Sequence, residues 1–186
     1  VSMPHAGHVL AVDDQGYVLC QYPVTRTVRT DSGTMPYTFH QYTLLGPDFS
    51  VLLDNIDEYY NVGQYDYSCD SELFYNGLVA VRVGATDWYL PDGGPWPRLY
   101  FNSKYMFIDR SGKTVSSSRY DEVSHENDRW FGCHGTTEYL LDSNGNEREQ
   151  ANYCYVPSTW AENIVEQAEK DGLRLSYHTP YRLNIH

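Results

Sequence analysis

The chain has 186 residues, which is enough for one domain with a hydrophobic core. Its net charge of −12, with 13 Lys and Arg and no basic run, excludes a protein that binds a phosphate backbone, so no nucleic-acid partner is expected. Aromatic residues make up 15% of the chain, and 18 of them are tyrosines, which favours many half-buried strands over disorder.

The sequence predicts neither a membrane span nor, in the residues given, a secretory leader. No apolar stretch approaches the roughly 20 residues that cross a bilayer, so no membrane insertion is expected. The first residues, Val1-Ser2-Met3-Pro4-His5, lack a charged segment followed by an apolar one. The sequence leaves localisation and oligomeric state open, as well as whether the chain is a fragment of a larger protein.

Three segments share an apolar run followed by Asp-x-x-Gly. They extend from Leu10 to Gly16, from Met106 to Gly112 and from Tyr139 to Gly145. Aspartate at the first position of a type I turn accepts hydrogen bonds from the following amides, and glycine suits the fourth position. Each segment therefore predicts a strand, a tight turn and a second strand.

The last two of these turns begin at Asp109 and Asp142, and the interval between them has the length of one structural repeat. A degenerate copy extends from Tyr42 to Tyr59, and its Asp57-Glu58 pair precedes Asp121-Glu122 by close to two such intervals. A period of this length is typical of repeat architectures, in which each hairpin packs on its neighbours. We therefore expect a mainly β, single-domain fold of four or five tandem hairpins.

The segment between these hairpins contains a turn, a strand and a loop. Asn76-Gly77 is a strong hairpin-turn signal, and residues 78–83 have the apolar pattern of a buried strand. Residues 88–97, WYLPDGGPWP, contain three prolines and two glycines, which bar regular structure. We expect a long loop there.

Composition changes after Tyr155, so residues 1–155 are expected to form the hairpin region and residues 156–186 an appendage packed on it. Thr159 and Glu162 have the spacing of a capping box, and the apolar side chains that follow share one face of a helix. Asp171-Gly172 ends this helix. Residues 173–177 and 181–185 then alternate as short strands.

The hairpin segments resemble the WG repeat family, bacterial tandem repeats of roughly three dozen residues. Tyr105 to Lys113 with Tyr120-Asp121 is similar to the first half of the family pattern, and Phe74 to Val81 is similar to the second half. The Trp-Gly pair behind the family name is absent, because Met106 stands at the glycine position. The resemblance is good over residues 73–146 and implies a non-enzymatic repeat region of mostly unassigned function.

Neither a metal site nor a cofactor is expected. The four cysteines, at positions 20, 69, 133 and 154, include no Cys-x-x-Cys pair, and whether they form disulfides stays open. Cys133 and His134, with His125 nearby, come nearest to a ligand set. Adjacent residues of a strand point to opposite faces, however, which argues against a shared ion.

Four acidic residues stand at or near the repeated turns, and they are Asp109, Asp121, Glu122 and Asp142. A glycosidase needs two carboxyl groups at a defined separation, and nothing in this spacing demands such a pair. Recurrence in successive copies favours a role in turns and strand ends. A small hydrolase that acts on carbohydrate through paired carboxylates is the alternative, and no catalytic residue is assigned.

Aromatic side chains are the candidates for binding. Trp88, Tyr89 and Trp96 of the proline-rich loop, together with Trp130, suit stacking on sugar rings or anchoring a protein partner. The competing interpretation is that these rings cover a short core. We expect a non-enzymatic interaction module that binds a protein or a glycan through this loop and one face of the hairpins.

Overall fold

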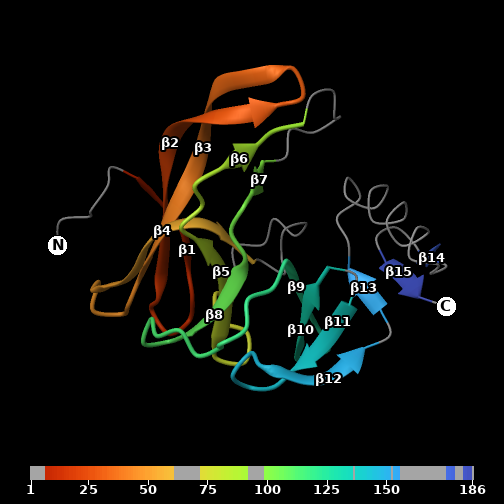
Figure 1. The fold of residues 1–186 in the computed structure, drawn as a ribbon. Coiled ribbons are helices and arrows are strands. Elements are labelled where there is room, and N and C mark those ends of the chain that lie inside the picture. Colours follow the sequence, from red (N-terminus) through yellow and green to blue (C-terminus); the bar gives the residue numbers. More distant parts are fainter. Residues whose placement is uncertain are drawn as a thin grey trace.

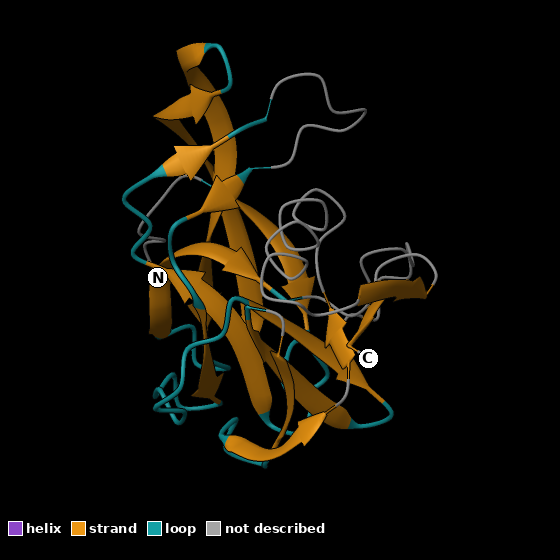
Figure 2. Cartoon of the chain, turned by 45° about the vertical axis from the view of Figure 1, so that its right-hand side comes forward, coloured by secondary structure: helices purple, strands orange, loops and turns teal. Residues whose placement is uncertain are grey.

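The computed structural model describes residues 7–60, 72–91, 99–135, 137–151, 153–155, 175–178 and 182–185. All regular structure in these residues is β-strand, which confirms the prediction of a mainly β fold (Figure 1; Figure 2). The strands in chain order are β1 (His8–Val12), β2 (Val18–Thr30), β3 (Gly33–Leu45), β4 (Val51–Tyr59), β5 (Leu78–Val83), β6 (Trp88–Tyr89), β7 (Tyr100–Phe101), β8 (Tyr105–Asp109), β9 (Glu122–Glu126), β10 (Arg129–His134), β11 (Thr137–Leu141), β12 (Glu147–Ala151), β13 (Tyr153–Tyr155), β14 (Leu175–His178) and β15 (Arg182–Ile185). The predicted helix, from Thr159 to Asp171, lies outside the described residues. In the part of the chain that the structure describes, no helix is long and apolar enough to span a membrane.

The largest sheet has eight strands in the order β7-β6-β2-β3-β4-β5-β8, with β1 paired to β2. Its β2 and β3 form a long antiparallel hairpin, paired from Val18 and Leu45 at one end to Thr30 and Gly33 at the other. Strands β1 and β4 pair only with the half of this hairpin that is farther from its turn. Residues 23–40 therefore project as an arm, and β6 and β7 lie beside it (Figure 1).

Two smaller antiparallel sheets follow in the chain. One has the order β12-β11-β10-β9, and it lies beside β5 and β8 (Figure 1). The other has the order β13-β15-β14, which confirms the two short strands predicted near the end of the chain. Because β13 pairs with β15, residues on both sides of the predicted boundary at 155 share one sheet.

The predicted aspartate turns are confirmed at Asp13, Asp109 and Asp142. In each turn, the Asp Oδ1 accepts the N–H groups of the residues two and four positions later, at 2.8 to 3.1 Å. The fourth residue is a glycine with φ between +71° and +83°. Residues 46–50 close the same backbone hydrogen bonds, and Phe49 takes the glycine position with φ +62°.

These four turns form two pairs along the chain. They begin at positions 13, 46, 109 and 142, so the interval from the first turn to the second equals that from the third to the fourth. The interval between the second and third turns is close to twice as long. The interval inside each pair equals the one that separates Asp109 from Asp142, and the tandem hairpin repeat itself stays a prediction.

The predicted Asn-Gly turn and the strand after it are also confirmed. Asn76 and Gly77 have φ values of +52° and +76°, as a type I′ hairpin turn requires. Every residue of β5 except the last is buried. Asn127 and Asp128 repeat this left-handed pair between β9 and β10.

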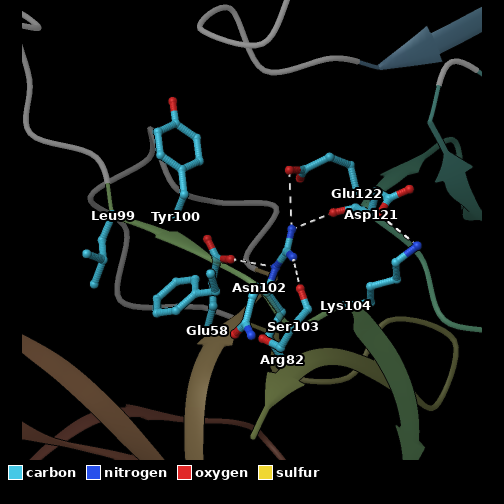
Figure 3. Close-up of a pocket in the computed structure, with 10 residues that line it drawn as sticks. Glu58, Arg82, Leu99, Tyr100, Asn102, Ser103, Lys104, Asp121 and Glu122 are labelled. Atoms are coloured by element: carbon cyan, nitrogen blue, oxygen red, sulfur yellow. Dashed lines mark hydrogen bonds and ion pairs between the residues drawn. The ribbon is translucent and has the colours of Figure 1, made fainter. Parts of the chain in front are cut away.

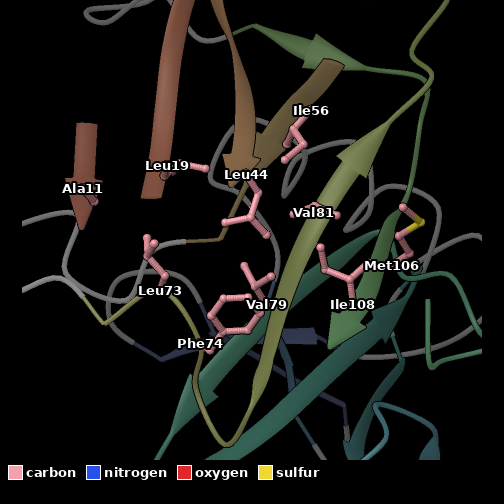
Figure 4. Close-up of a cluster of buried hydrophobic side chains, with 10 residues drawn as sticks. All are labelled: Ala11, Leu19, Leu44, Ile56, Leu73, Phe74, Val79, Val81, Met106 and Ile108. Atoms are coloured by element: carbon pink, nitrogen blue, oxygen red, sulfur yellow. The ribbon is translucent and has the colours of Figure 1, made fainter. Parts of the chain in front are cut away.

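Two large apolar clusters form most of the core, and a small third cluster contains Val18, Cys20 and Leu45. The first lies on one face of the large sheet, where side chains of β1 to β5 and β8 point toward one another (Figure 4). The second, with Phe107, Tyr120 and Trp130 among its members, lies between β5 and β8 on one side and the β9–β12 sheet on the other. Phe107 and Tyr120 are fully buried, so this cluster holds the two sheets together.

Candidate functional site

The structure separates the four aromatic residues that the sequence singled out. Trp88 and Tyr89 make up β6, whereas Trp96 lies outside the described residues. Trp130 lies on β10 and is only 3% exposed, with its ring 5.0 Å from that of Phe107 and its Nε1–H donating to the Tyr75 carbonyl at 3.0 Å. This corrects the expectation that Trp130 is a binding residue, because packing of the second sheet places it in the core.

The β6–β7 ribbon carries aromatic side chains on both of its faces. Trp88 pairs with Phe101, and the centroids of both rings lie about 6 Å from that of Phe39 on the arm. Phe39 is buried, so these two rings cover the core of the arm. Tyr89 pairs with Tyr100, and their rings stack with centroids 6.2 Å apart. Since alternate strand residues face opposite sides, the two partly exposed tyrosines form the other face of the ribbon.

A cavity of about 270 Å³, here called the arm cavity, opens beside the tyrosine pair. It is lined by Arg29, Asp87, Tyr89, Tyr100, Phe101 and Asn102. The Arg29 guanidinium forms a bidentate pair with the Asp87 carboxylate, at 2.9 and 2.6 Å, and lowers the pKa of that carboxyl group by hydrogen bonding to its charged form. The Asn102 side chain accepts the N–H groups of Thr86 and Asp87 and fixes the wall of the cavity.

A second cavity, of about 160 Å³, adjoins the first and is here called the Arg82 cavity (Figure 3). It is lined by Glu58, Arg82, Leu99, Tyr100, Phe101, Asn102, Ser103, Lys104, Asp121 and Glu122. Three residues, Tyr100, Phe101 and Asn102, line both cavities. The two cavities therefore adjoin at β7, and together they are here called the groove across β7.

Arg82 is the electrostatic centre of the second cavity. Its side chain is 9% exposed and forms ion pairs with Glu58 at 2.9 Å and with Glu122 at 3.2 Å. The guanidinium also donates to the carbonyls of Ser103 and Asp121, and it lies 4.1 Å from the centre of the Tyr105 ring. Burial alone would lower the pKa of Arg82, but the surrounding Tyr105 and carboxylates raise it above its ordinary value.

The glutamates that hold Arg82 belong to the two Asp-Glu pairs that the sequence repeats at positions 57 and 121. Glu58 and Glu122 lie on either side of the guanidinium (Figure 3). The two aspartates fix strand ends instead. Asp57 accepts the Ala85 N–H, and Asp121 accepts the Gly135 N–H, each at 2.8 Å. The strand-end role predicted for Asp121 is confirmed by its bond to Gly135, and Asp121 also lines the cavity together with Glu58 and Glu122.

Most of the groove could not be assigned from the sequence. Arg82 did carry a signal, since a lone charge in a buried apolar strand has to be paired. The repeated Asp-Glu pairs were recognised, but their common partner was not. Arg29, Asp87 and Tyr100 carry no local signal, because they meet only where β6 pairs with β2.

The described residues contain no group of three or more His, Cys, Asp and Glu side chains arranged to hold a metal ion. Cys133 is 2% exposed, while the ring of its neighbour His134 contacts Glu147 at 2.8 Å.

No protein-family model matches the chain, and no curated protein or solved structure is significantly similar to it. The chemistry of the groove is therefore the basis for a functional assignment.

Proposed function

We propose that this protein is a non-enzymatic interaction module that binds a protein or a glycan through the groove across β7. The observation that carries the proposal is the stacked pair of Tyr89 and Tyr100 beside two adjoining cavities. Tyrosine supplies a flat apolar face and a polar tip, and it is enriched where proteins contact partners. Arg29 and Asp87 add a directional set of hydrogen-bonding groups at the edge of the tyrosine pair.

A carbohydrate hydrolase is the alternative, and Glu58 and Glu122 are the pair of carboxylates that it would use. Such an enzyme needs one carboxyl group that gives a proton to the leaving group. Both glutamates are instead engaged with the guanidinium of Arg82, which occupies the space between them. Burial raises the pKa of Asp57, but this carboxyl group accepts hydrogen bonds from Gln41 and Ala85 and lines neither cavity. The geometry therefore favours binding over hydrolysis.

We also propose that the chain is a divergent WG repeat protein. The support is the recurrence of one turn geometry at four positions, which form two pairs with the same spacing. Strand β5 resembles the second half of the family pattern and β8 the first half, and the segment between them carries β6 and β7. The groove thus lies where the repeat pattern is broken.

The test compares partner capture by the wild-type chain with capture by Tyr100→Ala. A glycan array and a lysate pull-down are probed in parallel, with Phe49→Ala as the matched control, because Phe49 is an exposed aromatic residue that lines neither cavity. We expect a saturable signal that Tyr100→Ala weakens at least about tenfold and that Phe49→Ala retains. Equal capture by all three proteins would place the binding surface elsewhere.

A further inference from the structure

The two cavities differ in chemistry but share one wall. The arm cavity offers aromatic faces and one ion pair, whereas the Arg82 cavity offers carboxylates and ammonium or guanidinium groups. Each is smaller than the roughly 300 Å³ at which small-molecule sites begin, and a ligand that contacts both cavities crosses β7. A chain of similar units, with flat faces and many hydroxyl groups, matches this arrangement.

Aromatic rings and hydrogen-bonding groups both line the groove. Tyr89 and Tyr100 lie side by side on β6 and β7, and the Arg29 guanidinium carbon lies 5.8 Å from the centre of the Tyr89 ring. In the other cavity, Lys104 and Asp121 form an exposed ion pair at 3.0 Å, whose atoms can exchange water for hydroxyl groups. An apolar ring face with polar groups around its edge is the complement of a hexopyranose.

The charges in the groove select among glycans. The Arg82 cavity contains the carboxylates of Glu58, Asp121 and Glu122 against the cations Arg82 and Lys104, and the whole chain has a net charge of −12. Uronic acids, sialic acids and sulfated sugars are therefore disfavoured by repulsion. A neutral sugar meets no such repulsion.

The groove is less suited to a protein partner. The fully buried core of a protein interface is more apolar than the rest of the protein surface. The exposed large aliphatic side chains of the described residues, Val9, Leu10, Val12, Met35 and Val51, line neither cavity. Among the residues that line the two cavities, Leu99 is the one aliphatic side chain.

We infer that the groove across β7 binds a neutral oligosaccharide of at least two hexopyranose units. One unit stacks at Tyr89 and Tyr100, and the next places its hydroxyl groups against Lys104 and Asp121 in the Arg82 cavity. This inference rests on the proposed binding function and gives it a ligand class.

Isothermal titration calorimetry tests the inference with the full chain and three neutral hexasaccharides, namely cellohexaose, maltohexaose and mannohexaose. We expect saturable binding of at least one of them, which weakens about tenfold or more in Tyr100→Ala and is unchanged in Phe49→Ala. Far-ultraviolet circular dichroism of each variant shows that the fold is intact.

Because the ligand is proposed to contact both cavities, its affinity should depend on its length. The disaccharide of the same sugar should bind more weakly than the hexasaccharide, and Lys104→Ala should weaken the hexasaccharide about threefold while it leaves the disaccharide unchanged. Equal affinity for the two lengths, or no effect of Lys104→Ala, would overturn the assignment of the second cavity.

These measurements distinguish failure of the glycan inference from failure of the proposed binding function. If no neutral hexasaccharide binds, while Tyr100→Ala still abolishes capture of a protein, the glycan inference is overturned and the interaction module stands. If Tyr100→Ala changes neither glycan binding nor protein capture, both fail.

Discussion

Asp109 shows how one side chain defines a turn. Its Oδ1 accepts the N–H groups of Ser111 and Lys113 and the hydroxyl of Ser111, at 2.6 to 3.1 Å. The Ser111 hydroxyl, together with these amides, stabilises the carboxylate and lowers the pKa of Asp109. Asp13 and Asp142 make the same two amide contacts, so the side chain is a repeated structural element.

Asp109→Ala is expected to lower the free energy of unfolding by about 1 kcal/mol at neutral pH, because it removes hydrogen bonds at an exposed turn. A lowered pKa in the folded state stabilises the protein above the unfolded pKa of about 4, and this stabilisation is lost as the pH falls through the folded value. The difference between wild type and variant should therefore shrink below about pH 4. Urea unfolding of both proteins at several pH values measures this difference in the free energy of unfolding. Asp109→Asn is the control that keeps a hydrogen-bond acceptor. An unchanged difference at low pH would contradict this account.

Phe49 occupies the left-handed position that glycine occupies in the other three turns. Its φ is +62° and its side chain is 53% exposed, so it has backbone strain with little burial in return. Gly145 holds the same position in its turn but has no room for a side chain, since a Cβ atom there would lie 2.6 Å from the ring of Phe107.

Phe49→Gly should therefore raise the free energy of unfolding by up to about 1 kcal/mol, because relief of the left-handed strain exceeds the added entropy of the unfolded chain. Gly145→Ala should lower it by about 2 kcal/mol or more, because the methyl group displaces a buried ring. Thermal and chemical unfolding measure both changes. If Phe49→Gly were destabilising, the Phe49 ring would have to make contacts that its exposure does not indicate.

At the scale of elements, Arg82 joins strands that are far apart in the sequence. It projects from β5 to Glu58 on β4 and Glu122 on β9, and its guanidinium lies over the ring of Tyr105 on β8. Because β9 belongs to the second sheet, the residue connects both sheets at the floor of the groove. Its burial without these carboxylates would be strongly unfavourable.

Arg82→Met is expected to lower the free energy of unfolding by about 3 kcal/mol, since it leaves two half-buried carboxylates without their cation. Arg82→Lys should recover only part of this loss, because one ammonium group does not reproduce the planar set of guanidinium donors. The matched control is Arg148→Met, a change at an exposed arginine that should alter stability by less than about 0.5 kcal/mol. Equal stability of Arg82→Met and wild type would show that the ion pairs are dispensable.

The elements that the sequence predicted correctly are those with local signals. The turns at Asp13, Asp109 and Asp142 depend on side chains that bond to their own backbone, and Asn76-Gly77 depends on φ alone. Trp130 was misplaced because its burial depends on a second sheet that packs over it, which no local pattern reports. The arm of residues 23–40 and the groove beside it arise from pairing between strands that are distant in the sequence, so they too required the structure.

At the scale of the whole molecule, charge limits which partners can approach. The chain carries 25 acidic and 13 basic residues, so a basic partner would be attracted over long distances and an acidic one repelled. A neutral sugar experiences neither effect. Its affinity should then depend on contacts in the groove rather than on the surrounding field.

Binding of a neutral oligosaccharide should therefore change less than about twofold as NaCl rises from about 50 to 500 mM, a range over which exposed charges become screened. Calorimetric titration at several salt concentrations measures this dependence, with pH and temperature held fixed. A steep fall in affinity with salt would indicate that a cationic partner, rather than a neutral glycan, is the true ligand.

The central claim is that the groove across β7 binds a partner without changing it chemically. Amide chemical-shift mapping by nuclear magnetic resonance tests it most directly, with the oligosaccharide or protein that the chain retains as the titrant and mass spectrometry of that titrant after incubation. We predict shifts concentrated at residues 29, 87–89, 99–104 and 121–122, and a ligand of unchanged mass. Shifts concentrated on β1 or on the turn at residues 46–50, or cleavage of the ligand that Glu122→Gln abolishes, would contradict the account.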